Sequence, residues 1–557
     1  MSGASLQGLK LRTGRVLAFL WLAFIARGFW YCAVLPPWEG YDEPFHFAAL
    51  EHIASGQGMP HADAPISLEV EKSLALLPLP WMLTLHNIPG PLMSYDEFWR
   101  LPPAERDSRI TATRALPPEE GSRPATEEIV NYESQQPPLY YWLFGVALRW
   151  MSGSRLLSRI YILRLCNVLL ASVVIPLVYW IARRVLGSEP QALGTTAIVL
   201  LLPELMINLA RVSNEGIALV CYTVILAAAI ATVDKPLSWR AWILLGLGLG
   251  AGLLSKAYVL SAVPAVILLA ILVTSRSQRS GEQRVSWNSI VLRLTSTFVV
   301  TFAIAGAWYI GVHRATGSWT GVTDDVAARH LSLPQKFAQL PNVNWKSGAL
   351  SILISHLWFG AWSFLRVPDV IYVLAFVLIG GAIVGVFVRL VRKGARARET
   401  RAILGLAAFY LCFWAGLLYD VLVIYLTKGV SASAGWYLYA AVAAEIILLV
   451  WGLQAFFPAR IVFPGLALGI TALDLYGMHG LLMPYYTGLT WHVGKFVASA
   501  LWVTTTHLSV VFDRLDQLRP PWFPVSALLI AWILYCVATV GTATAVVLLF
   551  RGRLANE

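Results

Sequence analysis

Two acids and a histidine lie close together just after the first apolar segment of the chain. Asp42 and Glu43 are adjacent, and His46 follows them within four residues. Pro44 can occupy the first turn of a helix, where its missing N–H costs nothing, with Asp42 or Glu43 at the N-cap. The carboxylates and the imidazole could then share one helix face. There a carboxylate could take a proton from an attacking hydroxyl, and the acids with His46 could hold a divalent cation.

The same pattern has a purely structural interpretation. An aspartate before a helix is more often a cap than a catalyst, and capping would lower its basicity. Two acids at the outer end of a membrane helix could also form a solvated loop. On this segment alone both interpretations stay open, and the helix itself is expected to run to about Ala54 and to stop near Gly56.

The composition sets the class of protein. The chain has 557 residues, of which 57% are hydrophobic and 13% charged, with a mean hydropathy of +0.65. A soluble protein of this size does not need so much apolar sequence, so we expect an all-α, polytopic membrane protein. The net charge of +11 comes mostly from short connections between apolar segments. The membrane therefore accounts for the basic residues, and no nucleic-acid partner is expected.

The cysteines and the glycosylation signals narrow the setting. All five cysteines lie inside apolar segments, so we expect neither a disulfide framework nor a Cys-x-x-Cys metal site. The absence of Asn-x-Ser/Thr favours a bacterial or archaeal chain. The basic residues before the first apolar run, without a cleavage site after it, indicate a retained signal anchor.

About twelve transmembrane helices are expected. The stretch 137–151 is short and rich in aromatic residues, and counting it as a span would place Arg183 and Arg184 outside the cell, against the positive-inside rule. We therefore interpret it as an interfacial helix. The predicted spans are 16–35, 162–182, 191–210, 215–233, 240–255, 258–274, 290–313, 370–391, 402–427, 434–457, 460–477 and 525–550.

These spans divide the chain into alternating sides of the membrane, with basic residues such as Arg183, Arg276 and Arg396 in the cytoplasm. The expected divisions are a cytoplasmic N-terminus (1–15), the first transmembrane helix (16–35), an extracytoplasmic loop with interfacial helices (36–160), transmembrane helices 2–7 (161–314), an extracytoplasmic loop (315–369), transmembrane helices 8–11 (370–477), an extracytoplasmic loop (478–524), and the last transmembrane helix with a cytoplasmic tail (525–557).

This topology gathers ionisable residues at the outer ends of the helices. They are Arg211, Glu215, Lys256 and Arg366. Each has a common structural explanation, since cations snorkel to headgroups and a carboxylate opposes the dipole at a helix N-terminus. Because these residues gather at one mouth under a large acidic loop, a shared site is the better interpretation. Cations at the interface suit the phosphate of a lipid carrier.

The order of several motifs resembles that of a known superfamily. The motifs are Tyr41-Asp42-Glu43-Pro44-Phe45-His46, Gln136-Pro137-Pro138-Leu139-Tyr140-Tyr141, Ala182-Arg183-Arg184-Val185-Leu186-Gly187, Ala210-Arg211-Val212-Ser213-Asn214-Glu215 and Leu254-Ser255-Lys256. This order resembles the GT-C glycosyltransferases that use polyprenyl-phosphate sugars, in particular the protein-mannosyltransferase, aminoarabinose-transferase and DUF2142 branches. The resemblance covers roughly residues 15–275 well.

The resemblance implies a GT-C-like fold with Asp42 as the catalytic acid of the first outer loop. It also implies that Glu215 helps to bind a metal or the acceptor. Together with Glu43 and His46, Glu215 is thus a candidate ligand for Mg²⁺, Mn²⁺ or Ca²⁺. The chain departs from the family where Gln135-Gln136 precedes the two prolines and where Trp436 replaces an arginine. Arg211, Lys256 and Arg366 are the remaining candidates for the phosphate.

We therefore expect a multi-pass enzyme of the inner (plasma) membrane of a bacterium. It would move a sugar from a polyprenyl-phosphate donor to a glycan, lipid or protein acceptor on the extracytoplasmic face, with inversion. The alternative is a transporter or flippase of a lipid-linked or small solute, although transporters usually show internal repeats, and none is visible here. A non-enzymatic assembly scaffold is a third possibility.

Overall fold

The protein is a helical bundle with a polar cap at one end. The computed structural model describes residues 3–61, 64–84, 92–126, 129–274, 286–393, 398–493, 496–497 and 500–551. Within these ranges the only sheet is an antiparallel pair of two-residue strands, β1 (His492–Val493) and β2 (Phe496–Val497). The expected all-α class is confirmed.

Ten helical segments of the described chain are long and apolar enough to cross a membrane. A long apolar segment inside a membrane has no water to bind and must form its backbone hydrogen bonds internally, as these helices do. They comprise α1 (Gly3–Val34), α8 (Leu156–Ala171) with α9 (Val174–Leu186), α12 (Glu215–Asp234), η2 (Ala257–Ser261) with α14 (Ala262–Thr274), α15 (Trp287–Thr316), α19 (Asp369–Lys393), α20 (Arg398–Lys428), η6 (Gly435–Ala441) with α21 (Val442–Leu453), α22 (Ala459–Gly477) with η7 (Met478–Leu482) and α23 (Met483–Tyr486), and α26 (Val525–Arg551).

Two further predicted spans are helical but fall short of that length. The segment 191–210 is split into α10 (Glu189–Leu201) and α11 (Pro203–Leu209), which bend by 60° at the proline and would raise the total to eleven. The segment 240–255 is α13 (Trp239–Ser255), an apolar helix of 17 residues. Every predicted span thus lies on a helix, and the count of twelve crossings stays a prediction.

The predicted bounds shift at one outer end. The helix expected to stop at 477 continues through the π-helical turn η7 and α23 to Tyr486. The last outer segment therefore begins later than 478, and its helices are α24 (Leu501–Thr506) and α25 (Leu508–Gln517).

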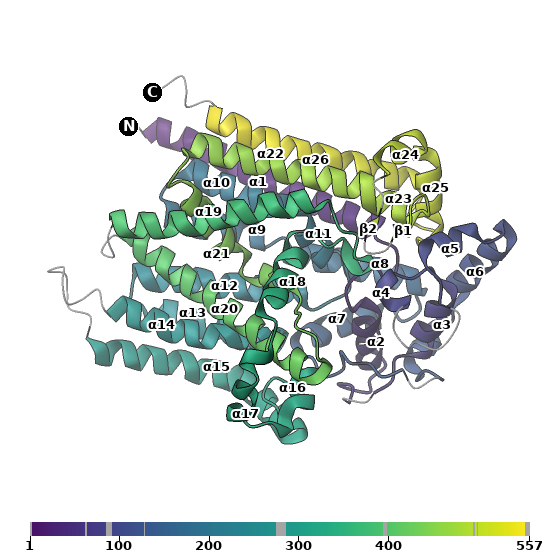
Figure 1. Ribbon diagram of the computed structural model, residues 1–557, viewed down its shortest axis with the longest axis horizontal. Helices are drawn as coiled ribbons and strands as arrows, with labels where there is room; N and C mark the ends of the chain where they lie inside the picture. Colours follow the sequence, from purple (N-terminus) through teal and green to yellow (C-terminus); the bar gives the residue numbers. More distant parts are fainter. Residues whose placement is uncertain are drawn as a thin grey trace.

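The polar cap is built mainly from residues 36–155. Its helices are α2 (Glu43–Ala54), α3 (Leu68–Leu76), α4 (Trp81–Thr84), α5 (Tyr95–Arg100), α6 (Pro103–Ala115), η1 (Pro118–Ser122) and α7 (Leu139–Trp150). Figure 1 shows them at one end of the bundle, with both chain termini at the opposite end. The helix expected from Pro44 to Ala54 is α2, and the expected interfacial helix is α7.

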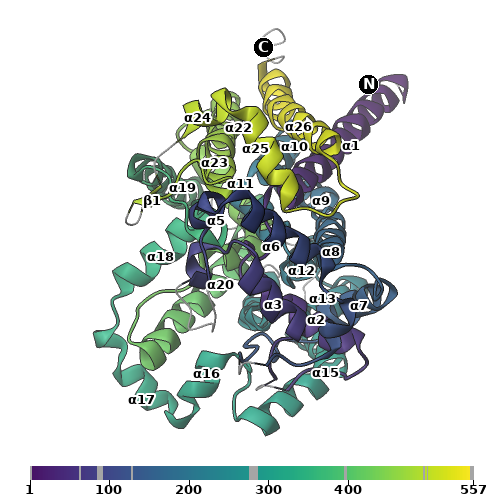
Figure 2. The same cartoon turned by 90° about the vertical axis from the view of Figure 1, so that its right-hand side faces the viewer.

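The segment between α15 and α19 lies beside this cap. It contains α16 (Thr323–Ala327), η3 (Ala328–His330), α17 (Leu333–Ala338), η4 (Leu340–Asn342), α18 (Trp345–Leu357) and η5 (Ala361–Ser363). Figure 2, which views the capped end face-on, shows α3, α5 and α6 over the bundle, with α16, α17 and α18 to one side.

Buried ion pairs fasten the cap to the bundle. Arg159 of α8 donates to Glu51 of α2 at 2.9 Å and also to Glu69 of α3. Within the bundle, Arg27 of α1 pairs with Asp474 of α22 at 2.8 Å, and both side chains are fully buried. A buried charge left without its partner costs about 3–5 kcal/mol, so these pairs fix the order in which the helices pack.

The opposite end carries basic residues that were expected in the cytoplasm. Asp234 at the end of α12 accepts from Arg184 of α9 at 2.8 Å and from Arg398 of α20 at 2.8 Å. The ends of three helices therefore meet on one side of the bundle. Arg276 and Arg396, which were expected on the same side, lie outside the described residues.

Candidate functional site

Asp42 stands at the N-cap position of α2 but does not cap it. Its backbone is left-handed, with φ 58°, and its side chain makes no hydrogen bond to the helix amides. A non-glycine residue in this region carries strain of about 1–3 kcal/mol, which persists only where the surroundings enforce it. The Asp42 carboxylate instead accepts from the Tyr132 hydroxyl, at 2.6 Å. It is partly exposed, whereas both sequence neighbours are buried.

Glu43, one residue later, is fully enclosed. Its carboxylate accepts from Arg164 Nε at 2.7 Å and Nη2 at 2.5 Å, and from the backbone N–H of Trp38 at 3.1 Å and of Val212 at 2.9 Å. Neither Glu43 nor Arg164 has exposed side-chain surface. This pair joins the first loop to α8 and to the turn before α12, so two adjacent acids have entirely different surroundings.

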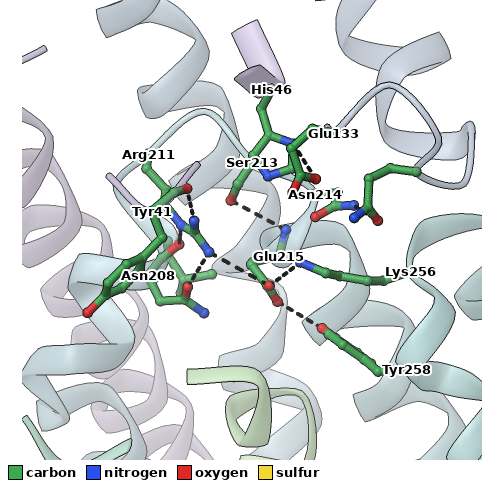
Figure 3. A network of polar contacts seen from close by, with 12 residues as sticks. Tyr41, His46, Glu133, Asn208, Arg211, Ser213, Asn214, Glu215, Lys256 and Tyr258 are labelled. Carbon is green, nitrogen blue, oxygen red and sulfur yellow. Dashed lines mark hydrogen bonds and ion pairs between the residues drawn. The ribbon is translucent and has the colours of Figure 1, made fainter. Parts of the chain in front are cut away.

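A second cluster lies at the start of α12. The Glu215 carboxylate accepts from Lys256 Nζ and from the Tyr258 hydroxyl, the latter at 2.8 Å, and lies 3.7 Å from Arg211 Nη2. Arg211 also donates to the Tyr41 carbonyl and to Asn208 Oδ1, the latter at 2.6 Å. Figure 3 shows Arg211 and Lys256 approaching Glu215 from two sides. The two cations are thus held by one carboxylate.

Aromatic rings from η6 line the same region. Tyr437 lies under Lys256 Nζ, 4.8 Å from its ring centre, and Trp436 stacks on Tyr41 at 3.8 Å and 8°. Gly435 makes this placement possible, because a Cβ there would lie 1.8 Å from the carbonyl oxygen of Ile352. The backbone of η6 therefore rests directly on α18.

His46 and Glu133 complete the site on the cap side. His46 Nδ1 lies 2.7 Å from the Tyr141 hydroxyl and 3.6 Å from Glu133 Oε2. Burial and, to a smaller extent, the charge of Asp42 raise the pKa of Glu133 to about 8. Burial, followed by the charges of Lys256 and Arg211, lowers the pKa of His46 well below its usual range. At neutral pH the two groups form a neutral contact.

Charge–charge interactions connect these groups into one site. The charges of Asp42, Lys256 and Arg211 act on the carboxyl group of Glu133. The charges of Asp42, Glu133 and Glu215 act on the hydroxyl group of Tyr437. One partly exposed carboxylate, one protonated carboxyl and two cations therefore lie near one another among tyrosine side chains. Such a set can accept a proton at one position and neutralise negative charge at another.

The family comparison bears directly on this region. Residues 135–304 match the family model described as dolichyl-phosphate-mannose-protein mannosyltransferase. This part of the chain therefore resembles that family of membrane glycosyltransferases. The matched range begins beside Glu133 and includes Arg211, Glu215 and Lys256. No curated protein sequence matches the chain.

Solved structures resemble the chain more distantly. ArnT from Cupriavidus metallidurans bound to undecaprenyl phosphate has a TM-score of 0.48 and 13% identity, over 98% of this chain and 79% of that one. The same protein in the apo state has a TM-score of 0.47 and 13% identity, over 97% and 77%. The Archaeoglobus fulgidus oligosaccharyltransferase in the apo form has a TM-score of 0.38 and 12% identity, over 96% and 56%. We take no residue role from structures this distant.

Of the three phosphate ligands predicted from the sequence, two lie in the site. Arg211 and Lys256 meet at Glu215, whereas Arg366 pairs with Asp369 at 3.1 Å and lies over the ring of Tyr372, at the start of α19. Arg366 is therefore engaged away from the cluster of Arg211, Glu215 and Lys256.

The three residues predicted to bind a metal do not form one donor set. Glu43 is saturated by Arg164 and two backbone amides, and Glu215 is held by two cations and a tyrosine. His46 directs Nδ1 at Tyr141. Among the described residues no group of three or more His, Cys, Asp or Glu side chains is placed to hold a metal ion. The residues present do not fit a divalent cation.

Sequence reasoning passed over several residues of the site. Glu133 was visible only as an acid near the Gln135-Gln136 motif, and nothing in the sequence indicated its closeness to Asp42. No sequence pattern distinguished Tyr132 or Tyr437 from the other aromatic residues of the chain. Such residues are found only when distant segments are brought together.

Two buried carboxylates hold the outer loops in register around the site. Glu39 accepts from the backbone N–H of Ser363 at 3.0 Å and from the Tyr95 hydroxyl at 2.8 Å. Glu204 accepts from the Tyr41 hydroxyl at 2.6 Å and from the backbone N–H of Phe359 at 2.9 Å. Burial raises the pKa of Glu39 to about 8. The segment that follows α18 is thereby tied to Glu39 and, through Glu204, to Tyr41, the residue before Asp42.

Proposed function

We propose that the protein is a GT-C-type glycosyltransferase that moves a sugar from a polyprenyl-phosphate donor to an acceptor hydroxyl, with inversion. In this reaction Asp42 is the general base. The observation that carries the proposal is that Asp42 sits at a helix start, in a strained backbone conformation, without capping the helix. Its carboxylate is free of helix amides and partly exposed. The family match, and the undecaprenyl phosphate bound to a distant structural relative, support a lipid-phosphate donor.

The chemistry follows from the two halves of the site. Asp42 takes the proton of the acceptor hydroxyl as its oxygen attacks the anomeric carbon of the donor sugar. The bond from that carbon to the phosphate oxygen breaks, and polyprenyl phosphate leaves. Arg211 and Lys256 offset the negative charge on the leaving phosphate. A single displacement of this kind inverts the anomeric configuration.

Glu215 has a positioning role in this scheme. In the absence of donor it holds Lys256 and Arg211 together, which prevents two buried cations from repelling each other. The donor phosphate would share these cations with Glu215 when it binds. No step is routed through a metal ion, because the predicted ligands are engaged with other partners.

The orientation is part of the proposal. We infer that the cap and the site face the outside of a bacterial inner membrane, since Arg184 and Arg398 gather at the other end of the bundle. The acceptor is a glycan, lipid or protein that reaches this face. Cysteines introduced at positions 107 and 184 test the orientation, since a membrane-impermeant thiol reagent should label 107 in intact cells and 184 only after permeabilisation. The reverse pattern would contradict it.

The decisive experiment compares two carboxylate-to-amide variants in liposomes that contain undecaprenyl-phosphate sugars and candidate acceptors. Asp42→Asn keeps a side chain that tolerates the left-handed backbone, but it cannot accept the proton. We expect its turnover to fall by about 10²–10⁴. Asp107→Asn on the exposed face of α6 is the matched control and should turn over normally. Near-normal turnover of Asp42→Asn, in protein with a normal elution profile, would refute the assignment.

A further inference from the structure

Three buried polar atoms around Asp42 have no hydrogen-bond partner among the described residues. They are Glu133 Oε2, Asn214 Oδ1 and Trp436 Nε1. Roughly 90% or more of buried polar groups in proteins are hydrogen-bonded, and leaving one unsatisfied is unfavourable. Glu133 and Asn214 both contact Gln136, and Trp436 stacks on Tyr41, the residue before Asp42, so we look for a common explanation.

Each of the three side chains is held rigidly. The Trp436 ring lies flat against Tyr41, which fixes the plane of the ring and of its N–H. Asn214 Nδ2 donates to Gln136 Oε1 at 3.2 Å and to the Ser255 carbonyl at 3.3 Å. A backbone carbonyl can only accept, so this contact fixes which end of the amide is Oδ1.

Glu133 is held through its backbone and its surroundings. Its N–H donates to Asn131 Oδ1 at 3.0 Å, and the Asn131 amide donates to the Phe45 carbonyl at 2.9 Å. The Glu133 residue is only 8% exposed. Figure 3 shows its carboxyl group between His46 and Asn214, above the cluster of Glu215 and Lys256. The unpartnered oxygens of Glu133 and Asn214 thus come from two different loops that meet at Gln136.

The chemical types of the three atoms select a ligand. Asn214 Oδ1 accepts, the Trp436 N–H only donates, and the protonated Glu133 carboxyl can donate or accept. A phosphate has acceptor oxygens alone and cannot satisfy Asn214 Oδ1. A metal ion cannot satisfy the N–H. A hydroxyl group both donates and accepts, so a ligand with several hydroxyls matches all three atoms.

We propose that Glu133, Asn214 and Trp436 form a hydroxyl-binding subsite for a sugar ring beside Asp42. This rests on the proposed function and adds to it the residues that hold the sugar rather than the phosphate. The sugar is either the one carried by the donor or one that belongs to the acceptor, since both present the same hydroxyl chemistry. Trp436 and Glu133 are therefore residues of substrate positioning and selection.

The test measures lipid binding by the purified full-length protein in detergent. The probes are undecaprenyl phosphate and a panel of undecaprenyl-phosphate monosaccharides. Trp436→Phe deletes the N–H and keeps a ring to stack on Tyr41, and Glu133→Met keeps an unbranched side chain but removes both carboxyl oxygens. Trp150→Phe, at an indole that is 85% exposed on α7, is the matched control and should bind as the wild type does.

We expect both site variants to bind the preferred sugar-bearing lipid about three- to tenfold more weakly, the usual worth of a neutral hydrogen bond. Their affinity for undecaprenyl phosphate should be unchanged. If the subsite holds an acceptor sugar, the same factor appears in the acceptor KM, and donor binding is unaltered. Either result supports the subsite.

Other outcomes overturn it. Equal losses for both lipids would assign these atoms to the phosphate, and no loss in either lipid or acceptor would assign them to ordered water. Wild-type protein that binds no sugar-bearing lipid better than undecaprenyl phosphate, and no acceptor sugar, would also refute the subsite. Failure of the wild type to bind any of the lipids would instead refute the proposed function.

A comparison of thermal stability tests whether the Trp436 N–H has a structural role instead. Trp358 Nε1 donates to the Leu365 carbonyl at 2.6 Å, so Trp358→Phe loses a buried hydrogen bond and should lower the Tm. Trp436→Phe makes the same chemical change at an N–H without a partner, and its Tm should not fall. A fall as large as that of Trp358→Phe would show that the Trp436 N–H has a structural partner.

Discussion

The Tyr132 hydroxyl donates to Asp42 Oδ1 at 2.6 Å, across 90 residues of sequence. This contact takes the place of the amide hydrogen bonds that an aspartate at a helix start normally accepts. Tyr132 in turn packs against Phe45 of α2, with ring centres 4.2 Å apart. The carboxylate is therefore aimed by a side chain of the cap rather than by its own helix.

Tyr132→Phe should slow catalysis without unfolding the cap. The variant keeps the ring that packs on Phe45 but removes the hydroxyl that orients Asp42. A hydrogen bond to a charged group is worth about 1.5–3 kcal/mol, so kcat should fall about tenfold or more. The donor KM should stay near the wild-type value, since Arg211 and Lys256 are untouched. An unchanged kcat would show that Asp42 is aimed by other contacts.

Lys256 should be separable from its structural partner by a double substitution. Lys256→Met leaves Glu215 without its closest cation and should lower both stability and donor affinity. The double variant Lys256→Met/Glu215→Gln removes both charges and should recover much of the Tm. Its donor KM should stay about tenfold or more above the wild-type value, because a charge-assisted phosphate contact is missing. Arg366→Met is the control. Recovery of donor KM together with Tm would contradict a phosphate role for Lys256.

Glu43 should behave as a structural residue. Glu43→Gln leaves Arg164 buried without a charged partner, and breaking such a pair costs about 3–5 kcal/mol. We expect poor expression or a strongly lowered Tm. Glu43→Gln/Arg164→Met removes both charges and should be less damaged. A Glu43→Gln protein with normal stability but no turnover would instead assign Glu43 to the chemistry.

The stability of the cap should fall as pH rises. The pKa of Glu39 is raised by burial to about 8 in the folded protein, above its ordinary value of 4.5, so its contribution is fully present below pH 4.5 and is lost as pH rises through 8. Glu39→Gln imitates the protonated form. Between pH 5 and 8.5 its Tm, measured in detergent, should decline less than that of the wild type. Parallel declines would show that Glu39 is not a main source of the pH dependence.

Chelation should leave the rate nearly unchanged. Glu43, His46 and Glu215 are each held by other side chains, so the site has no ready set of metal ligands. Turnover after treatment with EDTA should stay within about twofold of the untreated rate, far below the effect expected of a catalytic metal. A large loss that Mg²⁺ or Mn²⁺ restores would mean that donor binding rearranges these side chains into a metal site.

The membrane class, the positions of the helices and the segment that carries Asp42 and Glu43 could be predicted from the sequence. These follow from local patterns, because apolar length dictates a span and Pro44 marks the start of α2. The gathering of Arg211, Glu215 and Lys256 also followed from the sequence, since short turns on one side of a bundle must lie near one another.

Only the tertiary structure decided which of two adjacent acids is available for chemistry. The Glu43 carboxylate is paired with Arg164, which lies 121 residues away in the sequence, whereas the Asp42 carboxylate accepts a hydrogen bond from Tyr132 of the cap. Glu133 enters the site in the same way, through a loop whose path no local pattern specifies. A carboxylate's role depends on its burial and on its partners, and both are set by contacts between segments far apart in the chain.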